Sequence, residues 1–386
     1  MIVCAFLDIL PHMIALALIL FFTHVAILAW LTDGLCRTRR AARDNEALPA
    51  VSVIIAARDE AVKLPACLEA LARQTYAGKM QVIVVDDQSH DDTRQIAIAA
   101  AQGQKNWLVL DNRFAGHWRS SKKGALATAL QHASGEVLLF TDADCVPPPE
   151  WIAQTVRCFT PETDLVAGYA PLLVPQASRL WRDFIRVDTL ATAIVAAGSI
   201  GHGRGVTATG RNIACRRALL PGAEAYDRFP DSLSGDDDFL LQTATAASRT
   251  HQVRPRNPAC VWCPESIVPA RGPSNWRAFM KQKTRHLSAG YHYPRSAQLL
   301  YGVAHIAHVT LLLFFFIGLI KAPVLSLFFP AKMLLDAVLL GHCGRQWGTP
   351  ISLPGLLLWE LLYPVYQALA WWRGITGRPT WKEGKR

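Results

Sequence analysis

The chain has 386 residues, enough for one large domain or two, and 51% of them are hydrophobic. Its formal net charge is +10, but no nucleic-acid recognition motif accompanies that charge, so a nucleic-acid partner is not expected. The apolar residues are concentrated in three blocks, residues 13–31, 299–340 and 351–372. Each block approaches or exceeds the roughly 20 apolar residues that cross a bilayer. Because globular cores rarely contain such runs with polar flanks, the blocks predict membrane helices rather than buried core helices.

The first apolar block predicts an uncleaved membrane anchor. Residues 1–11 contain neither Lys nor Arg, and no clear small-residue cleavage site follows the block, so a signal peptide fits less well. Basic residues follow the block directly, namely Arg37, Arg39, Arg40 and Arg43. By the positive-inside rule, this side of the membrane is cytosolic. We therefore expect an anchor and basic linker at 1–47, a cytosolic domain at 48–295 and a C-terminal membrane region at 296–386.

The C-terminal region leaves the predicted topology in conflict. One N-terminal span followed by about three C-terminal spans places the C-terminus outside the cell, whereas a basic tail favours the inside. The basic residues of this tail are Arg373, Arg378, Lys382, Lys385 and Arg386. One solution is that residues 322–340, which contain two prolines and a lysine, are re-entrant or interfacial. The sequence alone leaves this choice open.

The chain contains nine cysteines. An odd number in a chain whose main domain faces the cytosol predicts free thiols. Cys260 and Cys263 form one CxxC pair, but a zinc site needs a second pair of ligands at a suitable spacing, and none is evident nearby. Metal or redox use of this pair stays open as the minor alternative.

Short β-rich runs alternate with helical patterns through the first part of the expected cytosolic domain. Strands are expected at 51–57, 81–87, 107–111 and 136–144. The helices between them are expected at 57–74, 89–101 and 121–133. This alternation predicts an α/β domain with a doubly wound, mostly parallel sheet.

Acidic residues follow two of the predicted strands. The second strand ends in Asp86 and Asp87, and the fourth in Asp142 and Asp144. Because doubly wound sheets bind ligands beyond the carboxyl ends of their strands, both clusters are expected at one binding edge. Crowded carboxylates repel one another unless a cation or a donor-rich ligand offsets them, and their oxygens suit Mg²⁺ or Mn²⁺. The sequence has no GxxxxGK[ST] loop, so a P-loop ATPase is excluded.

Six segments occur in the order and rough spacing of a membrane-anchored family 2 glycosyltransferase. They are VSVIIAARDE, VIVVDDQSHDDT, SKKGALATAL, FTDADCVPPPEW, SGDDDFLLQ and QKTRH. The resemblance spans about residues 50–290 and the flanking membrane segments. It implies a GT-A fold and a nucleotide-sugar donor, which in this family is usually UDP-linked. It also implies an inverting transfer to a lipid or lipid-linked acceptor at the cytosolic face of the membrane.

The resemblance implies a donor site, residue by residue. The acids that match those around the nucleoside are Asp59, Glu60, Asp86 and Asp87. Lys122 matches a basic residue near the diphosphate. Asp142 and Asp144 match the DxD motif, with Asp144 as the expected direct ligand of Mg²⁺ or Mn²⁺. This agrees with the chemistry, because a divalent cation neutralises the charge of a diphosphate leaving group.

Three consecutive acids, Asp236, Asp237 and Asp238, match an acidic pair whose second member is the family's catalytic base. Because Leu240 and Leu241 should start the packing face of the helix, we align Asp237 with the base and keep Asp236 as the second choice. A carboxylate within about 3 Å of the acceptor hydroxyl can take its proton during the attack on the sugar. The structural alternative is an acidic helix N-terminus favoured by the helix dipole.

Gln282 and Arg285 match the family's QxxRW motif, and His286 replaces its tryptophan. Because histidine offers less stacking area than tryptophan, stacking of a growing glycan is in doubt. A basic helix that binds lipid headgroups is the alternative. Arg211, in the segment TGRN, resembles an acceptor-side segment and is expected to meet a phosphate, the acceptor or a structural ion-pair partner.

Apolar residues predict two interfacial helices. The first, around the QxxRH segment, has Trp276, Phe279, Met280 and Leu287. The second has Leu180, Trp181, Phe184 and Ile185, although this stripe also fits a core helix.

Two other functions remain open from the sequence. A processive polysaccharide synthase would use the same active site but needs a translocation channel, and His286 argues against it. A catalytically silent scaffold is disfavoured by the complete acidic set. The sugar, the acceptor and the oligomeric state are not determined by the motifs.

Overall fold

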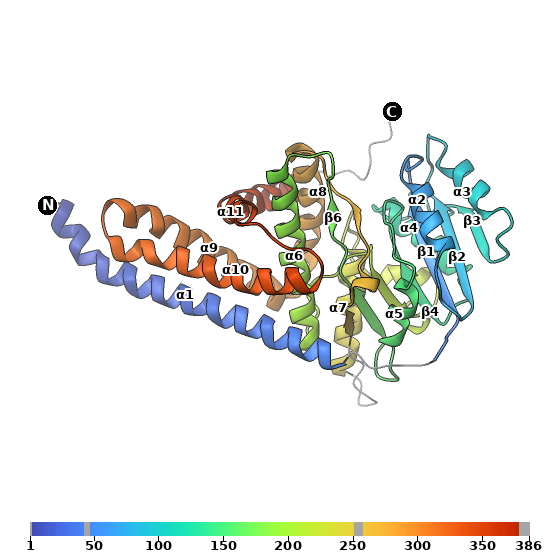
Figure 1. The fold of residues 1–386 in the computed structure, drawn as a ribbon, viewed down its shortest axis with the longest axis horizontal. Coiled ribbons are helices and arrows are strands. Elements are labelled where there is room, and N and C mark those ends of the chain that lie inside the picture. Colours follow the sequence, from blue (N-terminus) through green and yellow to red (C-terminus); the bar gives the residue numbers. More distant parts are fainter. Residues whose placement is uncertain (1, 42–46, 251–257, 378–386) are drawn as a thin grey trace.

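The computed structural model describes residues 2–41, 47–250 and 258–377, which form an α/β domain joined to a long helical projection (Figure 1). The helices are α1 (Ile2–Ala41), α2 (Leu64–Ala72), α3 (Thr93–Ala101), α4 (Ser121–Leu130), α5 (Trp151–Arg157), α6 (Arg179–Gly201), α7 (Asp236–Thr250), α8 (Trp276–Ala289), α9 (Arg295–Ile320), α10 (Phe328–Gln346) and α11 (Leu353–Thr376). The strands are β1 (Val51–Ala57), β2 (Met80–Asp86), β3 (Trp107–Asp111), β4 (Val137–Phe140), β5 (Leu165–Gly168), β6 (Leu172–Leu173), β7 (Ile213–Arg216), β8 (Ala259–Val261) and β9 (Ala270–Arg271). The short 3₁₀ turns are η1 (Arg217–Leu219), η2 (Ala223–Arg228), η3 (Pro264–Ser266), η4 (Gly290–His292) and η5 (Pro323–Leu327).

Several basic residues of the sequence analysis lie outside the described residues or have side chains that are not described. They are Arg39, Arg40, Arg43, Arg378, Lys382, Lys385 and Arg386.

The described strands form a seven-stranded sheet in the order β3-β2-β1-β4-β7-β5-β8, with β6 and β9 as a separate pair. Strands β1 to β4 are parallel to one another, and β7 runs antiparallel to both β4 and β5. The predicted doubly wound, mostly parallel sheet is therefore confirmed. The strand expected at 136–144 is shorter than predicted and ends at Phe140. The amide of Cys145 turns back to the carbonyl of Asp142 (3.1 Å), so the acids lie in a loop beyond β4.

Both faces of the sheet are covered, which explains why the central strands are continuously apolar. In β1, Ile54 packs into the core on the side of α4 and α6, whereas Val53 and Ile55 pack on the side of α2 and α5. Successive side chains of a strand point to opposite faces, so a seven-residue strand with buried side chains on both faces must lie at the centre of the domain.

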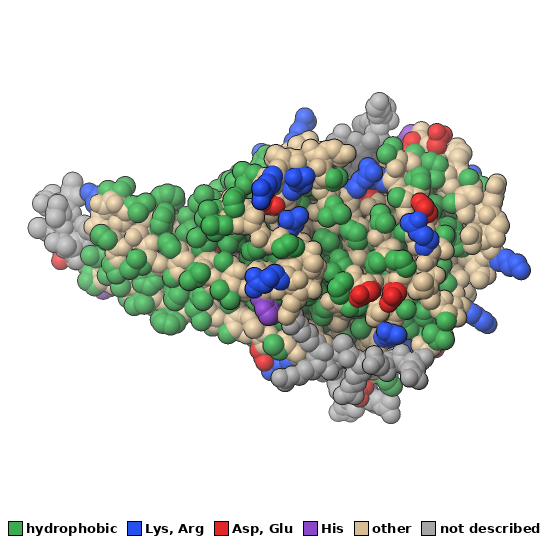
Figure 2. All heavy atoms as spheres, in the orientation of Figure 1, with side chains coloured by type: hydrophobic (Ala, Val, Ile, Leu, Met, Phe, Trp, Pro, Cys, Tyr) green, Lys and Arg blue, Asp and Glu red, His purple; other side chains and the backbone are tan. Residues whose placement is uncertain are grey.

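Helices α1, α9 and α10 pack along one another and form the three-helix bundle that projects from the α/β domain (Figure 1). Figure 2 shows hydrophobic side chains covering this bundle, with Lys and Arg gathered on the α/β domain and at the junction. Among the described residues, four segments are long and apolar enough to cross a membrane: Asp8–Thr38, Arg179–Gly201, Arg295–Ile320 and Pro323–Gln346. Most of residues 322–340, for which a re-entrant or interfacial path was one solution, belong to α10, which packs beside α1 and α9.

Helices α6, α8 and α11 run crosswise to the three-helix bundle at its junction with the α/β domain (Figure 1). They meet through aromatic rings, with Phe279 of α8 lying 5.3 Å from Phe184 of α6 and 5.1 Å from Tyr366 of α11. Phe184, Ile185, Phe279 and Met280 are buried, so at these positions the two stripes belong to the protein core, which was the alternative for the α6 stripe. Leu180 and Trp276 are exposed, and an interfacial position for them stays a prediction. More than half of the apolar window in α6 is buried in the same way.

Glycines allow α1 and α6 to cross in direct backbone contact. A Cβ atom on Gly34 of α1 would lie 2.0 Å from the carbonyl oxygen of Gly198, and one on Gly201 would lie 1.9 Å from the carbonyl oxygen of Gly34. No side chain fits at these distances, so the crossing depends on glycine.

We predict that Gly34→Ala destabilises the protein by about 1–3 kcal/mol or more, because the methyl group must push two helices apart. Gly302→Ala is the matched control, since Gly302 lies in α9 and a Cβ there meets nothing within 4 Å. The thermal midpoints of the two variants in detergent test this. Equal thermal midpoints for Gly34→Ala and Gly302→Ala would contradict the direct backbone contact between α1 and α6.

Candidate functional site

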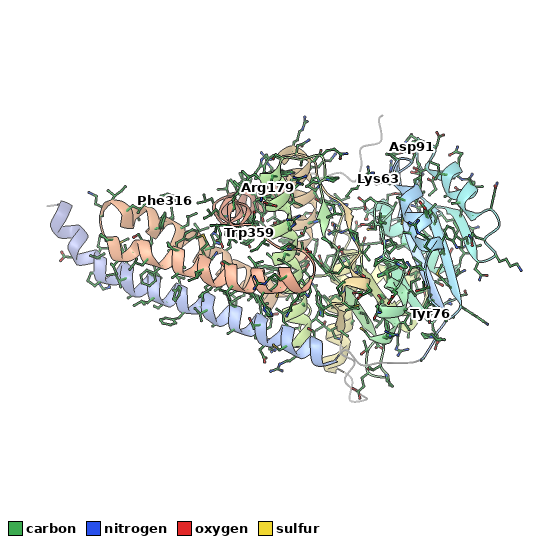
Figure 3. The ribbon with its side chains drawn as sticks, in the orientation of Figure 1. Lys63, Tyr76, Asp91, Arg179, Phe316 and Trp359 are labelled. Atoms are coloured by element: carbon green, nitrogen blue, oxygen red, sulfur yellow. The ribbon has the colours of Figure 1, made fainter. Side chains whose placement is uncertain are left out.

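Acidic residues follow three adjacent parallel strands at one edge of the sheet. In the order β2-β1-β4, the strands lead into Asp86 and Asp87, Asp59 and Glu60, and then Asp142 and Asp144. Figure 3 places Lys63 and Asp91 at this end of the domain and Tyr76 at the opposite end, where the Tyr76 hydroxyl donates to the carbonyl of Pro49 just before β1 (2.6 Å). The single binding edge expected from the sequence is therefore present.

Asp86 and Asp87 are both buried, and each has one carboxylate oxygen without a hydrogen bond from the described residues, although Arg58 Nη1 lies 3.9 Å from Asp87 Oδ2. Asp87 Oδ1 accepts hydrogen bonds from Asn112 Nδ2 (2.6 Å) and Ser121 Oγ (2.5 Å). Asp86 Oδ2 accepts from the amide of Ser89 (3.2 Å). Within the described chain, Asp86 Oδ1 and Asp87 Oδ2 are buried without a hydrogen-bond partner. Such oxygens suit the N–H or O–H donors of a ligand, because leaving a buried acceptor unpaired is costly.

The loops after β1 and β2 are fastened to each other in an unusual backbone conformation. Asp59 has φ 51° and Gln88 has φ 58°, a left-handed region that residues other than glycine seldom adopt. The amide of His90 donates to Asp59 Oδ1 (2.7 Å), and the amide of Glu60 donates to Thr93 Oγ1 (2.7 Å). Backbone strain of this kind persists where the surrounding structure enforces it, and it is frequent at functional sites.

The two acids of the DxD segment have different electrostatic surroundings. Lys122 Nζ lies 2.5 Å from Asp142 Oδ1. Burial opposes ionisation of Asp142, but Lys122 and Arg211 outweigh it and hold the pKa of that carboxyl below its ordinary value. Burial and the neighbouring Asp142 carboxylate raise the pKa of Asp144, while Lys63 Nζ stands 3.9 Å from it. Asp144 is therefore the carboxylate of the pair that a further cation would stabilise most.

Asp237 shares the pocket of Lys122 and Asp142. Its Oδ2 accepts the amide of Gly210 (2.6 Å), and a Cβ on Gly210 would lie 3.6 Å from both Asp237 Oδ2 and Lys122 Nζ. Burial alone would lower the pKa of Lys122, but Asp142 and then Asp237 raise it, so Lys122 stays protonated. The structure thus brings together two carboxylates and the ammonium group between them, from the loop after β4, from α7 and from α4.

The flanking acids of the DDD run face elsewhere. Asp236 Oδ1 lies 3.7 Å from Lys123 Nζ, and burial raises the pKa of Asp236 to about 6. Asp238 accepts hydrogen bonds from Thr207 Oγ1 (2.8 Å), the amide of Ala208 (2.9 Å) and the hydroxyl of Tyr293. Burial, followed by the Asp237 carboxylate, raises the pKa of Asp238 to about 7. Of the three acids, Asp237 is the one held beside Lys122.

Helix α8 carries the QxxRH segment toward this pocket. Gln282 and Arg285 lie three residues apart and therefore on one face of the helix. Arg285 is within electrostatic reach of Asp142 and Asp237, whereas His286 is exposed and stands 3.4 Å from Arg285 Nη2. Arg211 enters from the loop before β7, where its Nε donates to Thr209 Oγ1 (3.0 Å) and its Nη1 is buried without a hydrogen-bond partner among described residues.

A buried ion pair fixes the position of α8. Lys283 Nζ lies 2.6 Å from Asp188 Oδ2 on α6, and both side chains are largely buried. Asp188 Oδ1 also accepts the hydroxyl of Tyr366 (2.5 Å) and the indole N–H of Trp359 (3.4 Å), both on α11. The three crosswise helices are thus tied together one residue away from Gln282.

The acidic groups fit a divalent cation that also binds phosphate. No cluster of three or more His, Cys, Asp or Glu side chains suitable for a metal occurs in the described parts of the chain. Asp142 and Asp144 therefore offer two carboxylates, and Mg²⁺ typically binds through one or two carboxylates with substrate phosphates completing its coordination. The CxxC pair does not form a metal cluster in these residues either, and all cysteines whose state is described are free thiols.

Sequence reasoning missed several polar partners in the site. Lys63, which lies 3.0 Å from Glu60 and near Asp144, was detectable as a basic residue one turn after Glu60. The contacts of Asn112 with Asp87 and of Tyr293 with Asp238 join residues 25 and 55 positions apart. No local sequence signal marks such pairs.

The matches to known families identify the class of protein. The sequence matches glycosyl transferase family 2 over residues 52–212 and glycosyl transferase family group 2 over residues 137–372. Because the second match spans more than half of the chain, this protein belongs to the family 2 glycosyltransferases, and the family predicted from the six motifs is confirmed.

Curated relatives of this chain are glycosyltransferases. Glycosyltransferase AglE of Haloferax volcanii is 34% identical over 133 residues, covering 33% of this chain and 41% of that protein. The probable glycosyltransferase YdaM of Bacillus subtilis is 26% identical over 249 residues, covering 63% of this chain and 56% of that protein. An undecaprenyl-phosphate 4-deoxy-4-formamido-L-arabinose transferase of Aeromonas hydrophila is 32% identical over 127 residues, covering 32% and 37%. The chain thus spans less than two thirds of the length of these relatives.

A solved structure shares the fold over nearly the whole chain. The mannosyltransferase PcManGT of Pyrobaculum calidifontis, in complex with GDP-Man and Mn²⁺, superposes with a TM-score of 0.54 at 20% identity, covering 94% of this chain and 99% of that chain. At this identity the likeness shows the fold alone. The expected GT-A fold is confirmed.

Asp238 predicts a pH dependence of stability. Because its pKa rises from 3.8 to about 7 on folding, the folded protein favours the protonated carboxyl. The resulting stabilisation is complete below about pH 4, declines as the pH rises and is lost above about pH 7. Asp238→Asn should reduce the fall in thermal midpoint across this window, since the asparagine oxygen keeps the bonds from Thr207 and Ala208 and its Nδ2 can donate to the hydroxyl oxygen of Tyr293. Glu69→Gln, at an exposed side chain of α2, should leave the slope unchanged. If the thermal midpoint of Asp238→Asn falls with pH as steeply as that of the unchanged protein, Asp238 is not the group responsible.

The Lys283–Asp188 pair predicts a large cost for removing one partner. Lys283→Met leaves the Asp188 carboxylate buried without its cation, and we expect a loss of about 3–5 kcal/mol in stability. Adding Asp188→Asn should recover part of this loss. Arg73→Met breaks an exposed pair with Glu69 and should cost less than about 1 kcal/mol. Thermal or denaturant midpoints are compared for the parent, Lys283→Met, Lys283→Met with Asp188→Asn, and Arg73→Met. Equal losses of stability in Lys283→Met and Arg73→Met would refute the role assigned to the Lys283–Asp188 pair.

Proposed function

We propose that this glycosyltransferase moves a sugar, with inversion at the anomeric carbon, from a nucleoside-diphosphate donor to a lipid or lipid-linked acceptor at the cytosolic face of a membrane. The observation that carries the proposal is the pocket of Lys122, Asp142 and Asp237, which lies beside α8 and the membrane-length helices. Its groups separate into a phosphate-binding part and a proton-accepting part.

Asp144 and Asp142 would hold Mg²⁺ or Mn²⁺ together with the donor's diphosphate. When bound, such a cation neutralises the charge of the leaving nucleoside diphosphate. Lys122 and Arg285 place positive charge on the same side of the pocket, where charge-assisted hydrogen bonds to phosphate oxygens are strong. Arg211, with a buried and unpaired Nη1 in the described structure, is a further phosphate donor.

Asp59, Glu60, Asp86 and Asp87 would bind the nucleoside of the donor. The buried acceptor oxygens of Asp86 and Asp87 suit the N–H groups of a base or the ribose hydroxyls. The family resemblance favours a UDP-sugar, while the PcManGT structure was solved with GDP-Man, so both donor classes belong in a test.

Asp237 would act as the base that takes the proton of the acceptor hydroxyl. Its Oδ2 is anchored by the amide of Gly210, which leaves Oδ1 as the oxygen that can accept a proton. Asp236 pairs with Lys123 and Asp238 with Tyr293, so neither competes for this role. One base is sufficient because direct displacement needs no carboxylate nucleophile.

The acceptor would approach along α8, with Gln282, Arg285 and the exposed His286 at its surface. A lipid acceptor is supported by the apolar bundle next to this helix and by the Aeromonas hydrophila relative, whose name specifies an undecaprenyl-phosphate transferase. We place α1, α9 and α10 across the cell membrane with the α/β domain, residues 48–295, in the cytosol and residues 296–386 as the C-terminal membrane region.

The decisive assay measures nucleoside-diphosphate release by the full chain in native-lipid nanodiscs, with UDP- and GDP-sugars, Mn²⁺, Mg²⁺ or EDTA. We expect release with one donor and its loss in EDTA. Asp237→Asn should lower the rate by about 10²–10⁴-fold while the donor still binds. Asp144→Asn should abolish metal-dependent donor binding. Asp111→Asn, at an exposed carboxylate on β3, is the matched control and should be fully active.

The products of this assay separate the remaining functions. One sugar per acceptor supports the proposal, whereas a ladder of longer products identifies a processive synthase. Undiminished release by both Asp237→Asn and Asp144→Asn would refute the assigned roles. Failure of any donor to bind in the presence of metal would favour a silent scaffold.

A further inference from the structure

The carboxylate of Asp238 lies next to the base proposed above, but its two oxygens have different partners. The side chain is buried. Its Oδ1 accepts two hydrogen bonds, from Thr207 Oγ1 (2.8 Å) and from the amide of Ala208 (2.9 Å). Its Oδ2 faces the hydroxyl of Tyr293. Because the amide of Ala208 can only donate, Oδ1 always accepts, whereas the Tyr293 hydroxyl can either donate or accept.

This arrangement satisfies the carboxyl group in both of its protonation states. When Asp238 is ionised, the Tyr293 hydroxyl donates to Oδ2. When Asp238 is protonated, the proton belongs on Oδ2 and is donated to the Tyr293 oxygen, while Oδ1 keeps both of its donors. Neither state leaves an oxygen of Asp238 unpaired, so neither carries the cost of a buried group without a partner. A carboxyl group placed in this way can gain or lose a proton without a rearrangement of its neighbours.

The charged surroundings of Asp238 differ from those of Asp236 on the same helix. Asp236 has Lys123 as its ion-pair partner (3.7 Å), whereas the described residues provide no cation that pairs with Asp238. Three titratable groups from three segments face Asp238, namely Asp237 of α7, Tyr293 after η4 and Tyr301 of α9. Burial and then the charge of Asp237 oppose ionisation and raise the pKa of Asp238 to about 7. Both protonation states of Asp238 are therefore populated near neutral pH.

The interaction between Asp237 and Asp238 is reciprocal. The charge of one carboxylate favours the arrival of a proton on the other, and this coupling has the same size in both directions. During the proposed transfer, the acceptor hydroxyl loses its proton to Asp237 Oδ1. A negative charge on Asp238 favours this step, and a protonated Asp238 removes that assistance. The proton of Asp238 itself takes no part in the transfer and is exchanged with solvent.

Asp238 also joins the base to the segments on either side of it. The loop that holds Asp238 Oδ1 continues to Gly210, whose amide holds Asp237 Oδ2 (2.6 Å). Tyr293 belongs to the segment between α8 and the membrane-length helix α9, and Gln298 in the first turn of α9 donates to its carbonyl oxygen (2.9 Å). The Asp238 carboxylate is thus held beside the base from three directions.

We propose that Asp238, together with Tyr293, is a positioning residue for the base, and that its charge assists the transfer of the acceptor proton to Asp237. The inference rests on the sugar transfer proposed above and adds to it a carboxylate that direct displacement does not itself require. It makes the rate of transfer depend on the protonation state of Asp238. Transfer is slower while Asp238 is protonated and reaches a plateau once Asp238 is ionised.

The test is the pH profile of kcat/KM for the full chain in native-lipid nanodiscs, with the UDP- or GDP-sugar and the metal that support nucleoside-diphosphate release. For the parent protein, kcat/KM should rise about 3–10-fold between about pH 6 and about pH 8, because the rate follows the strength of a base only in part. Asp238→Asn should lack this rise and stay near the low-pH value of the parent. Its Nδ2 donates to the Tyr293 oxygen as the protonated carboxyl does, so the variant reproduces the protonated state.

Tyr293→Phe separates this role from a purely structural contact. The substitution removes the donor of the ionised Oδ2, so the rise in kcat/KM should move to higher pH by about one unit. At a sufficiently high pH the variant should regain the parent rate, which a misfolded protein could not do. Tyr291→Phe is the matched control, since the Tyr291 side chain is exposed and lies two residues away, and it should keep the parent profile.

The possible results decide between the proposal and its alternatives. A flat parent profile across this pH range, or a parental rise in Asp238→Asn, would overturn the proposal. So would a Tyr293→Phe profile that is lowered equally at every pH, because that result identifies a structural contact only. None of these results affects the sugar transfer itself. The transfer fails separately if the parent releases no nucleoside diphosphate or if Asp237→Asn is as active as the parent, and the inference would then fall with it.

Discussion

The structure depends on one electrostatic constraint, which is that carboxylates cannot be crowded at a partly buried sheet edge without cationic partners. Three adjacent parallel strands each lead into acids at the same edge. Lys122 lies against Asp142 and beside Asp237, and Lys63 lies between Glu60 and Asp144. The partners of each acid therefore separate the cluster into three parts, to which the proposed sugar transfer assigns the nucleoside, the phosphates and the base.

The position of that centre relative to the membrane-length helices follows from buried ion pairs outside it. Lys283 joins α8 to Asp188 on α6, and Asp188 also binds α11. Glu360 then joins α11 to Lys332 in the bundle. Such pairs contribute little net stability but are costly to break, so they specify one arrangement of helices. An acceptor held in the membrane would thus meet a pocket at a fixed height above the lipid surface.

The comparisons with known proteins establish the family and the fold, whereas the reaction depends on the individual residues of the site. The two family matches together cover residues 52–372, which include the α/β domain and the helices after it, and the PcManGT likeness extends over nearly the whole chain. Donor, acceptor and stereochemistry depend on hydrogen bonds that a shared fold does not fix. In this chain, the buried oxygens of Asp86 and Asp87 and the exposed His286 are where such differences would arise.

The sequence by itself determined the parallel sheet, the motif order and the edge at which Asp86, Asp87, Asp142 and Asp144 gather, because strand alternation and strand ends are local patterns. It could not decide among the three acids at 236–238, since that choice depends on distant partners such as Gly210 and Tyr293. It could not show that Phe184 and Phe279 are buried in the protein core, because apolar spacing alone does not distinguish lipid from protein core. Only the tertiary structure showed that α11 returns to the α/β domain, since hydrophobic length does not give a helix its direction.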